Sequence, residues 1–340
     1  MDRALINLIR LTACLLFAAG AQTLAAQTAY DSAVRPATAS SPTPLPPVAE
    51  PQPAQTVRFQ RRPVQVGDRA QQEVTVGLQL SSRFTQSGQI ANESQSTLRR
   101  EQRRRIEVTG VEGDRIQTAT IKFDHSRNQS PENPDPETLT VQVVEGKTYL
   151  AERRGEAMLV TDEAGVIPPL DEYKLVADVA ENLGKPNPLA NLLLERPIAV
   201  GQRILVPREA AASVLGLREQ VGTVKRFELR LERLEPTPAV PSAAAEPVGD
   251  IAVFAATIET LPNESTPLEL TLTGMVAVEV SSCRTVAAEF RGPVQMSTIE
   301  RTRADIYQFS AAGDLTVSIR SQYDCVAPKS AARIPLSLRR

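Results

Sequence analysis

The chain has 340 residues, a formal net charge of −2 and a single histidine, so the chain as a whole lacks the excess of positive charge that binding to nucleic acid or anionic membranes favours. Aromatic residues make up only 4% and tryptophan is absent, which argues against an aromatic platform for sugars or single-stranded nucleic acid. The length allows one large or two moderate domains.

The N-terminus has the pattern of an export signal. Residues 1–10 carry two arginines, and residues 11–18 form an apolar core that is shorter than the roughly 20 residues of a membrane span. We predict a signal peptide over residues 1–21, with cleavage up to residue 26 as the alternative. Cys14 ends a lipobox-like Leu-Thr-Ala-Cys sequence, but Arg10 interrupts the apolar run before it, so a lipid anchor there is the less favoured interpretation.

Residues 22–63 are rich in proline, alanine and serine and contain few apolar residues that could build a core. This composition is typical of an extended, disordered spacer. A second proline-rich stretch, residues 236–247, is shorter and lies inside the part expected to fold, so we interpret it as a surface loop. The remaining residues, 64–338, are predicted to form a single β domain.

Apolar and polar residues alternate in short runs through most of this domain, which is the period-2 pattern of half-buried strands. Examples are residues 74–80, 119–123 and 268–280, the last being the longest clean alternation in the chain. The connections are too short for parallel crossovers. The sequence therefore predicts a mainly β protein with a large curved antiparallel sheet or half-barrel of about ten strands.

One segment, residues 167–197, interrupts this pattern with helical periodicity. Helices are expected over about residues 168–194 and again over residues 207–215, packed on the sheet. The candidate apolar face of the first helical segment repeats at helical spacing and would cover the sheet. Its members are Tyr173, Val176, Ala180 and Leu183.

Turn motifs on either side of the helical segment recur at nearly constant spacing. Gly67 and Gly201 are 134 residues apart, Gly113 and Gly249 are 136 apart, and Gly155 and Gly292 are 137 apart. We predict that the domain consists of two repeats, about residues 64–166 and 198–323, joined by the helical segment. The alternative is that short turn sequences recur by chance in a β-rich chain.

Several of these motifs resemble those of a family of exported bacterial proteins whose function is unknown. The resemblance covers about residues 66–324 and includes Glu-Gly-Lys-Thr-Tyr-Leu at 145–150, Val-Thr-Asp-Glu-Ala-Gly at 160–165 and Leu-Gly-Lys-Pro-Asn-Pro at 183–188. It implies an architecture similar to the periplasmic lipoprotein carriers, in which an open β half-barrel covered by helices holds acyl chains. The motifs are turns, so the resemblance assigns no ligand-binding residue.

Catalytic and metal-binding patterns are weak. His125 lies beside Asp124 and Ser126, but neighbours in sequence do not form a triad, whose members converge from separate segments. One histidine and two distant cysteines do not suit a zinc site. We therefore expect no enzyme, no cofactor and no nucleic-acid partner, and interpret His125 as a solvated turn residue.

The strongest local charge feature is an arginine-rich run on a predicted strand, in which the arginines fall on both faces. We expect this end of the strand to project beyond the body or to lie at a sheet edge, where charge prevents aggregation. The functional alternative is a basic rim for phosphate-bearing head groups or an acidic partner. The candidate residues are Arg99, Arg100, Arg103, Arg104 and Arg105.

After removal of the signal, two cysteines remain, Cys283 and Cys325, and an exported protein with two cysteines favours a disulfide. A meander of three strands over residues 285–290, 297–307 and 315–321 would place the cysteines at opposite ends of the sheet, too far apart for a bond. A disulfide, free thiols and an inter-chain bridge all stay open.

Two functional hypotheses follow. The first is a non-catalytic, exported cell-envelope protein, periplasmic or secreted, that acts as a structural or protein-interaction module. The second is a carrier or binding protein for an apolar ligand, such as a lipid or a lipoprotein acyl chain, held between sheet and helices. A cavity of at least about 300 Å³ at the interface of sheet and helices distinguishes the second from the first.

Overall fold

The computed structural model describes residues 55–129, 138–155, 157–181, 183–184, 188–214, 223–236, 250–262, 268–302 and 305–326. These residues are mainly strand and form one large antiparallel sheet, as predicted from the alternation. The predicted signal peptide, Cys14 and most of the proline-rich spacer lie outside the described residues. The strands of the large sheet are β2 (Arg69–Gln86), β3 (Gln89–Glu112), β4 (Arg115–Asn128), β5 (Thr140–Val141), β6 (Thr148–Arg154), β7 (Ala157–Asp162), β9 (Arg203–Leu205), β10 (Thr223–Glu235), β11 (Ile251–Leu261), β12 (Leu268–Glu279), β13 (Arg284–Arg301) and β14 (Ile306–Asp324).

The sheet has twelve described strands in the order β7-β6-β4-β3-β2-β14-β13-β12-β11-β10-β9, with β5 paired to β4 off this path. It is open, with β7 and β9 at its two edges. The first strand of the N-terminal half, β2, pairs along its whole length with the last strand of the C-terminal half, β14. The centre of the sheet is therefore a junction between segments more than two hundred residues apart.

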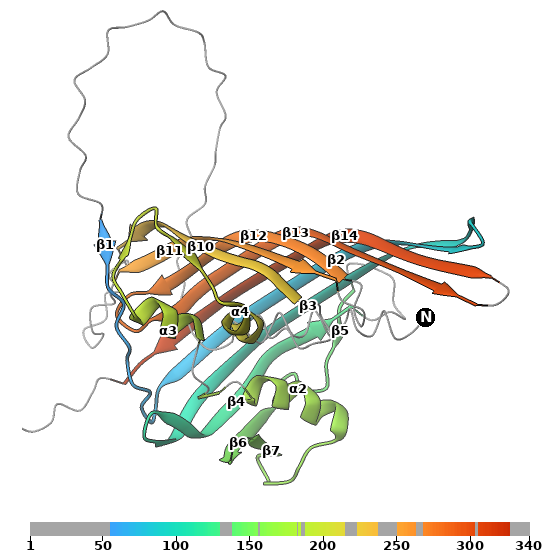
Figure 1. Cartoon of the computed structure of the whole chain (residues 1–340). Helices are drawn as coiled ribbons and strands as arrows, with labels where there is room; N and C mark the ends of the chain where they lie inside the picture. Colours follow the sequence, from blue (N-terminus) through green and yellow to red (C-terminus); the bar gives the residue numbers. More distant parts are fainter. Residues whose placement is uncertain are drawn as a thin grey trace, which may run out of the picture.

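In the described part of the chain, three short helices lie on one side of the curved sheet, beneath its arch (Figure 1). They are α2 (Leu170–Ala180), α3 (Pro188–Leu194) and α4 (Arg208–Val214), close to the ranges predicted. The core forms two clusters: α3 and α4 pack with β2 and β10–β14, whereas α2 packs with β3, β4, β6 and β7. The ends of the long hairpins β2–β3 and β13–β14 extend beyond the helices (Figure 1).

Part of the expected spacer belongs to the fold. A two-stranded sheet pairs β1 (Thr56–Val57) with β8 (Ile198–Ala199). Phe59 is buried and stacks on Phe254, with ring centroids 6.1 Å apart. The predicted spacer boundary at residue 63 is therefore too late. Val57 and Phe59, two of the few apolar residues in this stretch, are buried and anchor it to the fold.

The turns before β2 and β9 make the same hydrogen bonds. The N–H of Gly67 donates to the carbonyl of Val108 at 2.8 Å, and the N–H of Gly201 donates to that of Leu231 at 2.7 Å. The carbonyl of the residue after each glycine accepts a bond from the N–H of that same strand residue. Both glycines have positive φ, 93° and 85°, the region that glycine adopts without steric cost. The duplication itself stays a prediction.

The other two pairs of turn motifs are less alike. Gly113 occupies the β3–β4 turn with φ 58°, whereas Gly249 lies outside the described residues. Gly155 occupies the β6–β7 turn with φ 64°, but Gly292 lies inside β13, paired with Leu315. The third spacing therefore joins a turn to the middle of a strand.

Glycines on the inner face let the sheet bend. A Cβ at Gly274, Gly292 or Gly313 would meet a carbonyl oxygen of the neighbouring strand at 1.9, 2.0 and 1.7 Å. The backbones approach too closely there for any side chain, which is how curvature is built into a sheet. A side chain at any of these positions would push the neighbouring strands apart.

Candidate functional site

The apolar face of α2 is part of the packed core. Val176 and Ala180 are fully buried, Leu183 just after the helix is 2% exposed, and Tyr173 packs at the margin of the same cluster. The sheet residues beneath this face include Ile121 and Phe123, both fully buried. The face that the sequence predicted to lie over the sheet thus seals it at this end.

Polar contacts hold α2 at a defined height over β6. The hydroxyl of Tyr149 donates to Glu172 Oε1 at 2.7 Å, and Lys147 Nζ donates to Oε2 of the same carboxylate at 2.6 Å. Burial favours the neutral acid, but these two bonds outweigh it and lower the pKa of Glu172. Burial and the adjacent carboxylate raise the pKa of Tyr149, so the phenol stays a donor.

The arginine run does not form a rim. It lies within β3, which is flanked by β2 and β4 and is not an edge strand. Its members alternate between the faces of the sheet, so Arg99, Arg103 and Arg105 are exposed on the outer face while Arg100 and Arg104 point to the inner face. The expectation of a projecting or edge position is therefore wrong, because the strand continues to residue 89 with an exposed, polar sequence that carries no apolar signal.

Two of the outer arginines have carboxylate partners. Arg105 contacts Asp124 through two hydrogen bonds of 2.8 and 2.7 Å, and Arg99 lies 2.5 Å from Glu101. Exposed pairs of this kind contribute roughly 0–1 kcal/mol each and leave little net charge for a partner. The outer face offers paired charges instead of a basic patch.

The inner arginines belong to a buried polar layer between the two core clusters. Arg104 is 2% exposed and donates to the side-chain oxygens of Gln72 at 2.8 Å and Gln102 at 2.9 Å. Gln102 in turn donates to Ser126 Oγ at 3.2 Å. Sequence reasoning missed the two glutamines, although each takes an inward position in its strand's alternation and could have been found there.

The cysteines lie near each other in the topology and are not bonded. β13 begins at residue 284 and β14 ends at residue 324, and the two strands pair as one long hairpin, so Cys283 and Cys325 flank the same end of the sheet. The expectation that they lie at opposite ends is wrong. Both are free thiols, with Cys283 buried and Cys325 accepting a bond from Arg284 Nη1 at 2.8 Å.

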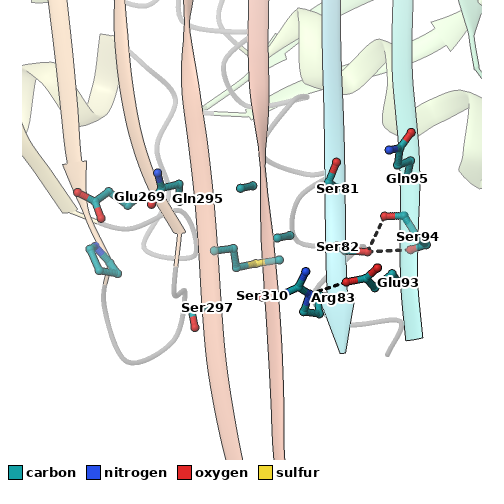
Figure 2. A pocket seen from close by; sticks show the side chains of 14 residues that line it. Ser81, Ser82, Arg83, Glu93, Ser94, Gln95, Glu269, Gln295, Ser297 and Ser310 are labelled. Atoms are coloured by element: carbon teal, nitrogen blue, oxygen red, sulfur yellow. Dashed lines mark hydrogen bonds and ion pairs between the residues drawn. The ribbon is translucent and has the colours of Figure 1, made fainter. Parts of the chain in front are cut away.

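A pocket of about 760 Å³ lies on the sheet beyond the helices, where strands from both halves of the chain meet (Figure 2). Ser82 on β2, Ser94 on β3 and Ala311 on β14 are direct cross-strand neighbours, and Met296 on β13 pairs with Ala311. All of these belong to the inner row of their strands, which places the pocket at the distal end of the concave face. The other lining residues are Ser81, Arg83, Glu93, Gln95, Pro262, Glu269, Gln295, Ser297, Ser310 and Ala312.

The pocket combines hydroxyl groups with small apolar surfaces. The hydroxyls of Ser82 and Ser94 are 2.8 Å apart and hydrogen-bonded, and Arg83 Nε contacts Glu93 Oε1 at 2.6 Å (Figure 2). Arg83 and Glu93 neutralise each other, so the pocket can offer hydrogen bonds and apolar contact to an uncharged or amphiphilic group. Sequence reasoning did not find it, because small polar residues on strands carry no periodic apolar signal.

His125 lies inside β4, not in a turn. Its Nε2 is 3.6 Å from a carboxylate oxygen of Glu101, and its Nδ1 is 3.4 Å from one of Glu145. Within the described part of the chain, no three His, Cys, Asp or Glu side chains gather as a metal site would require. No helix among these residues is long and apolar enough to cross a membrane.

Comparisons with known proteins leave the family open. No protein-family model matches the chain, and no curated protein is significantly similar to it. A structure described as lipid–protein interactions in lipovitellin is 9% identical with a TM-score of 0.31, and the match covers 77% of this chain but only 26% of that one. A chain of the Pseudomonas aeruginosa MucA/MucB complex is 10% identical, with a TM-score of 0.10 over 71% of this chain and 88% of that chain. Similarity this low carries no argument about function.

Proposed function

We propose that the protein is a non-catalytic binding protein that takes an amphiphilic ligand in the pocket at the distal end of its concave face. The observation that carries the proposal is the pocket volume of about 760 Å³, which falls within the range of about 300–1,000 Å³ for ligand sites. The pocket lies away from α2, whose apolar face is packed, so the ligand contacts strands from both halves of the sheet instead of the helix.

The test is ligand binding by variants that fill the pocket. Ser82→Trp places an indole between Ser94 and Ala311, and Gln79→Trp places the same group on the outer face of β2, where residue 79 is exposed. With 11-(dansylamino)undecanoic acid as the probe, we expect the fluorescence-detected affinity to fall at least about tenfold in the first variant and to stay unchanged in the second. The proposal would be contradicted if the wild-type protein did not bind the probe and native mass spectrometry found no co-purifying lipid.

A second candidate function is a structural or protein-interaction module. It is favoured by the sealed interface between α2 and the sheet and by the two open edges, since an edge strand presents unpaired backbone groups to a partner. In-cell crosslinking separates the candidates: a specific crosslinked partner supports this one, and recovery of monomer alone argues against it.

Export is part of the proposal under either candidate. Its support is the two-arginine start, the short apolar core and the small residues up to position 26. Mass spectrometry of the N-terminus of protein recovered from its own cells is the test. A first residue between 22 and 27 is expected, and an intact residue 1 would contradict export by a cleaved signal.

A further inference from the structure

The buried polar layer on β2 and β3 has more positive charge and more donors than its described neighbours satisfy. Arg100 and Arg104 lie four residues apart on the inner face of β3, so their Cα atoms are about 13 Å apart along the strand. Burial and the charge of Arg100 lower the pKa of Arg104 to about 9, so Arg104 stays charged at neutral pH and lies within the field of Arg100.

The described carboxylates near Arg100 and Arg104 do not balance the positive charge of the two side chains. Among the described residues, Arg104 donates side-chain hydrogen bonds only to the neutral amides of Gln72 and Gln102. Within the described part of the chain, the acid whose charge acts on Arg100 is Asp178 on α2. Among the described residues, the buried Arg104 and the half-buried Arg100 therefore face one carboxylate, and a buried charge without a partner is costly unless a further group neutralises it.

Three buried donors beside these cations also lack an acceptor within the described residues: Arg100 Nε, Gln72 Nε2 and Ser321 Oγ. Two of them adjoin Arg104. Gln72 lies directly opposite Arg104 on one side and opposite Ser321 on the other, and its amide oxygen is already used by Arg104. A group that fills this site must supply several acceptor atoms and negative charge.

We infer that this layer binds a phosphate group, held between β3 and α2 by Arg100 and Arg104 and by the free donors of Gln72 and Ser321. A phosphate brings three or more acceptor oxygens, and guanidinium groups match them in fork geometry. A carboxylate offers two oxygens and leaves part of the donor set unsatisfied. The inference does not rest on the pocket described above, which lies at the far end of the same face.

The phosphate can be free or can be the head group of an anionic amphiphile. The inner rows beyond Arg100 are apolar, with Val76, Leu78 and Leu315 each no more than 1% exposed. These rows run toward the distal pocket. These rows are packed in the first core cluster, so either source presents only its phosphate to the polar layer, and experiment distinguishes the two.

The experiment measures binding to the full mature chain by isothermal titration calorimetry and by the thermal unfolding midpoint. One arm uses inorganic phosphate at constant ionic strength, and a second uses monomeric dihexanoyl phosphatidylglycerol. The variants are Arg104→Gln, which keeps a side chain of similar reach without the charge, and Arg103→Gln, which removes an exposed arginine from the outer face of the same strand.

We expect Arg104→Gln to weaken binding at least about tenfold, because a charge-assisted contact is lost, and Arg103→Gln to leave it unchanged. Arg104→Lys, which keeps the charge but loses the fork, should recover part of the affinity. If only the phospholipid binds, its phosphate is the head group of an amphiphile; if both bind equally, the phosphate alone is recognised.

Wild-type measurements keep the inference falsifiable if Arg104→Gln does not fold. Either probe should raise the wild-type unfolding midpoint, while chloride at equal ionic strength should not. No wild-type response to either probe overturns the inference. Equal losses of binding in Arg104→Gln and Arg103→Gln would also overturn it, because they would indicate adsorption to the charged surface.

Discussion

Tyr149 and Glu172 join the sheet to the helix that covers its first half, through a hydrogen bond of 2.7 Å between the phenol and the carboxylate. Glu172 is only 7% exposed, so an amide at this position loses the ionic contact with Lys147 and weakens the polar contacts that hold the side chain. We expect Glu172→Gln to lower the free energy of unfolding by about 1–3 kcal/mol, measured by urea denaturation. Asp171→Asn, at the exposed preceding residue, is the control and should change little.

The same pair predicts a pH dependence. The folded-state pKa of Glu172 is lowered, so its contribution is complete above the unfolded pKa of about 4.3 and is lost as pH falls through the folded value. Wild-type stability should therefore fall below about pH 4 more steeply than that of Glu172→Gln. Parallel curves for the two proteins would show that the carboxylate is not ionically held.

The sealed face of α2 makes a prediction about packing. Leu183→Ala removes a side chain that is 2% exposed within the second core cluster and should cost about 2–5 kcal/mol. Leu170→Ala, at a position 65% exposed on the same helical segment, should change stability by no more than about 0.5 kcal/mol. Equal, small losses of stability in the two variants would mean that this face of α2 covers an open space instead of packing in a core.

Close backbone approach on the inner face predicts intolerance of any side chain. In Gly313→Ala the new methyl group meets Gln79 O at 1.7 Å, which backbone movement alone can relieve, whereas in Gly77→Ala it meets Thr316 Oγ1 at 2.8 Å, a side-chain atom that rotation about χ1 can move. We expect the first variant to be destabilised by at least about 1–3 kcal/mol and the second to lie near wild type. Thermal unfolding followed by circular dichroism tests this, and similar midpoints would contradict the curvature argument.

The fold was predictable where alternation is strong and one face is buried. Residues 268–280 predicted β12 almost to its ends, and helical spacing at Val176 and Ala180 placed α2 on the sheet. Alternation also predicted that the arginines of β3 take both faces. It could not show that the inner face at Arg104 is covered. Alternation tells which residues of a strand share a face, but not which other segment of the chain packs on that face.

Strand ends were hardest to predict where a glycine serves close packing inside a strand instead of a turn. Gly292-Pro293 and Gly313-Asp314 have the composition of turns, so three short strands were predicted where β13 and β14 run through as one hairpin. The glycines are there because the neighbouring backbone leaves no room for a Cβ. This misinterpretation moved Cys283 and Cys325 to opposite ends of the sheet. The pocket gave no sequence signal, since it arises only when both halves of the chain meet at β2 and β14.

The two thiols should be free and unequal in reactivity. Burial raises the pKa of Cys283 to about 12; burial also raises that of Cys325, but Arg284 and Arg62 oppose this by favouring the thiolate. Since the thiolate is the nucleophile, iodoacetamide at pH 8 should label Cys325 faster than Cys283 in the folded protein, and both should label rapidly in urea. Peptide mass spectrometry gives the two rates. A Cys283–Cys325 disulfide in protein purified without reductant would contradict the free-thiol arrangement, and Cys325→Ser, which cannot bridge, would then leave Cys283 with its slow labelling rate.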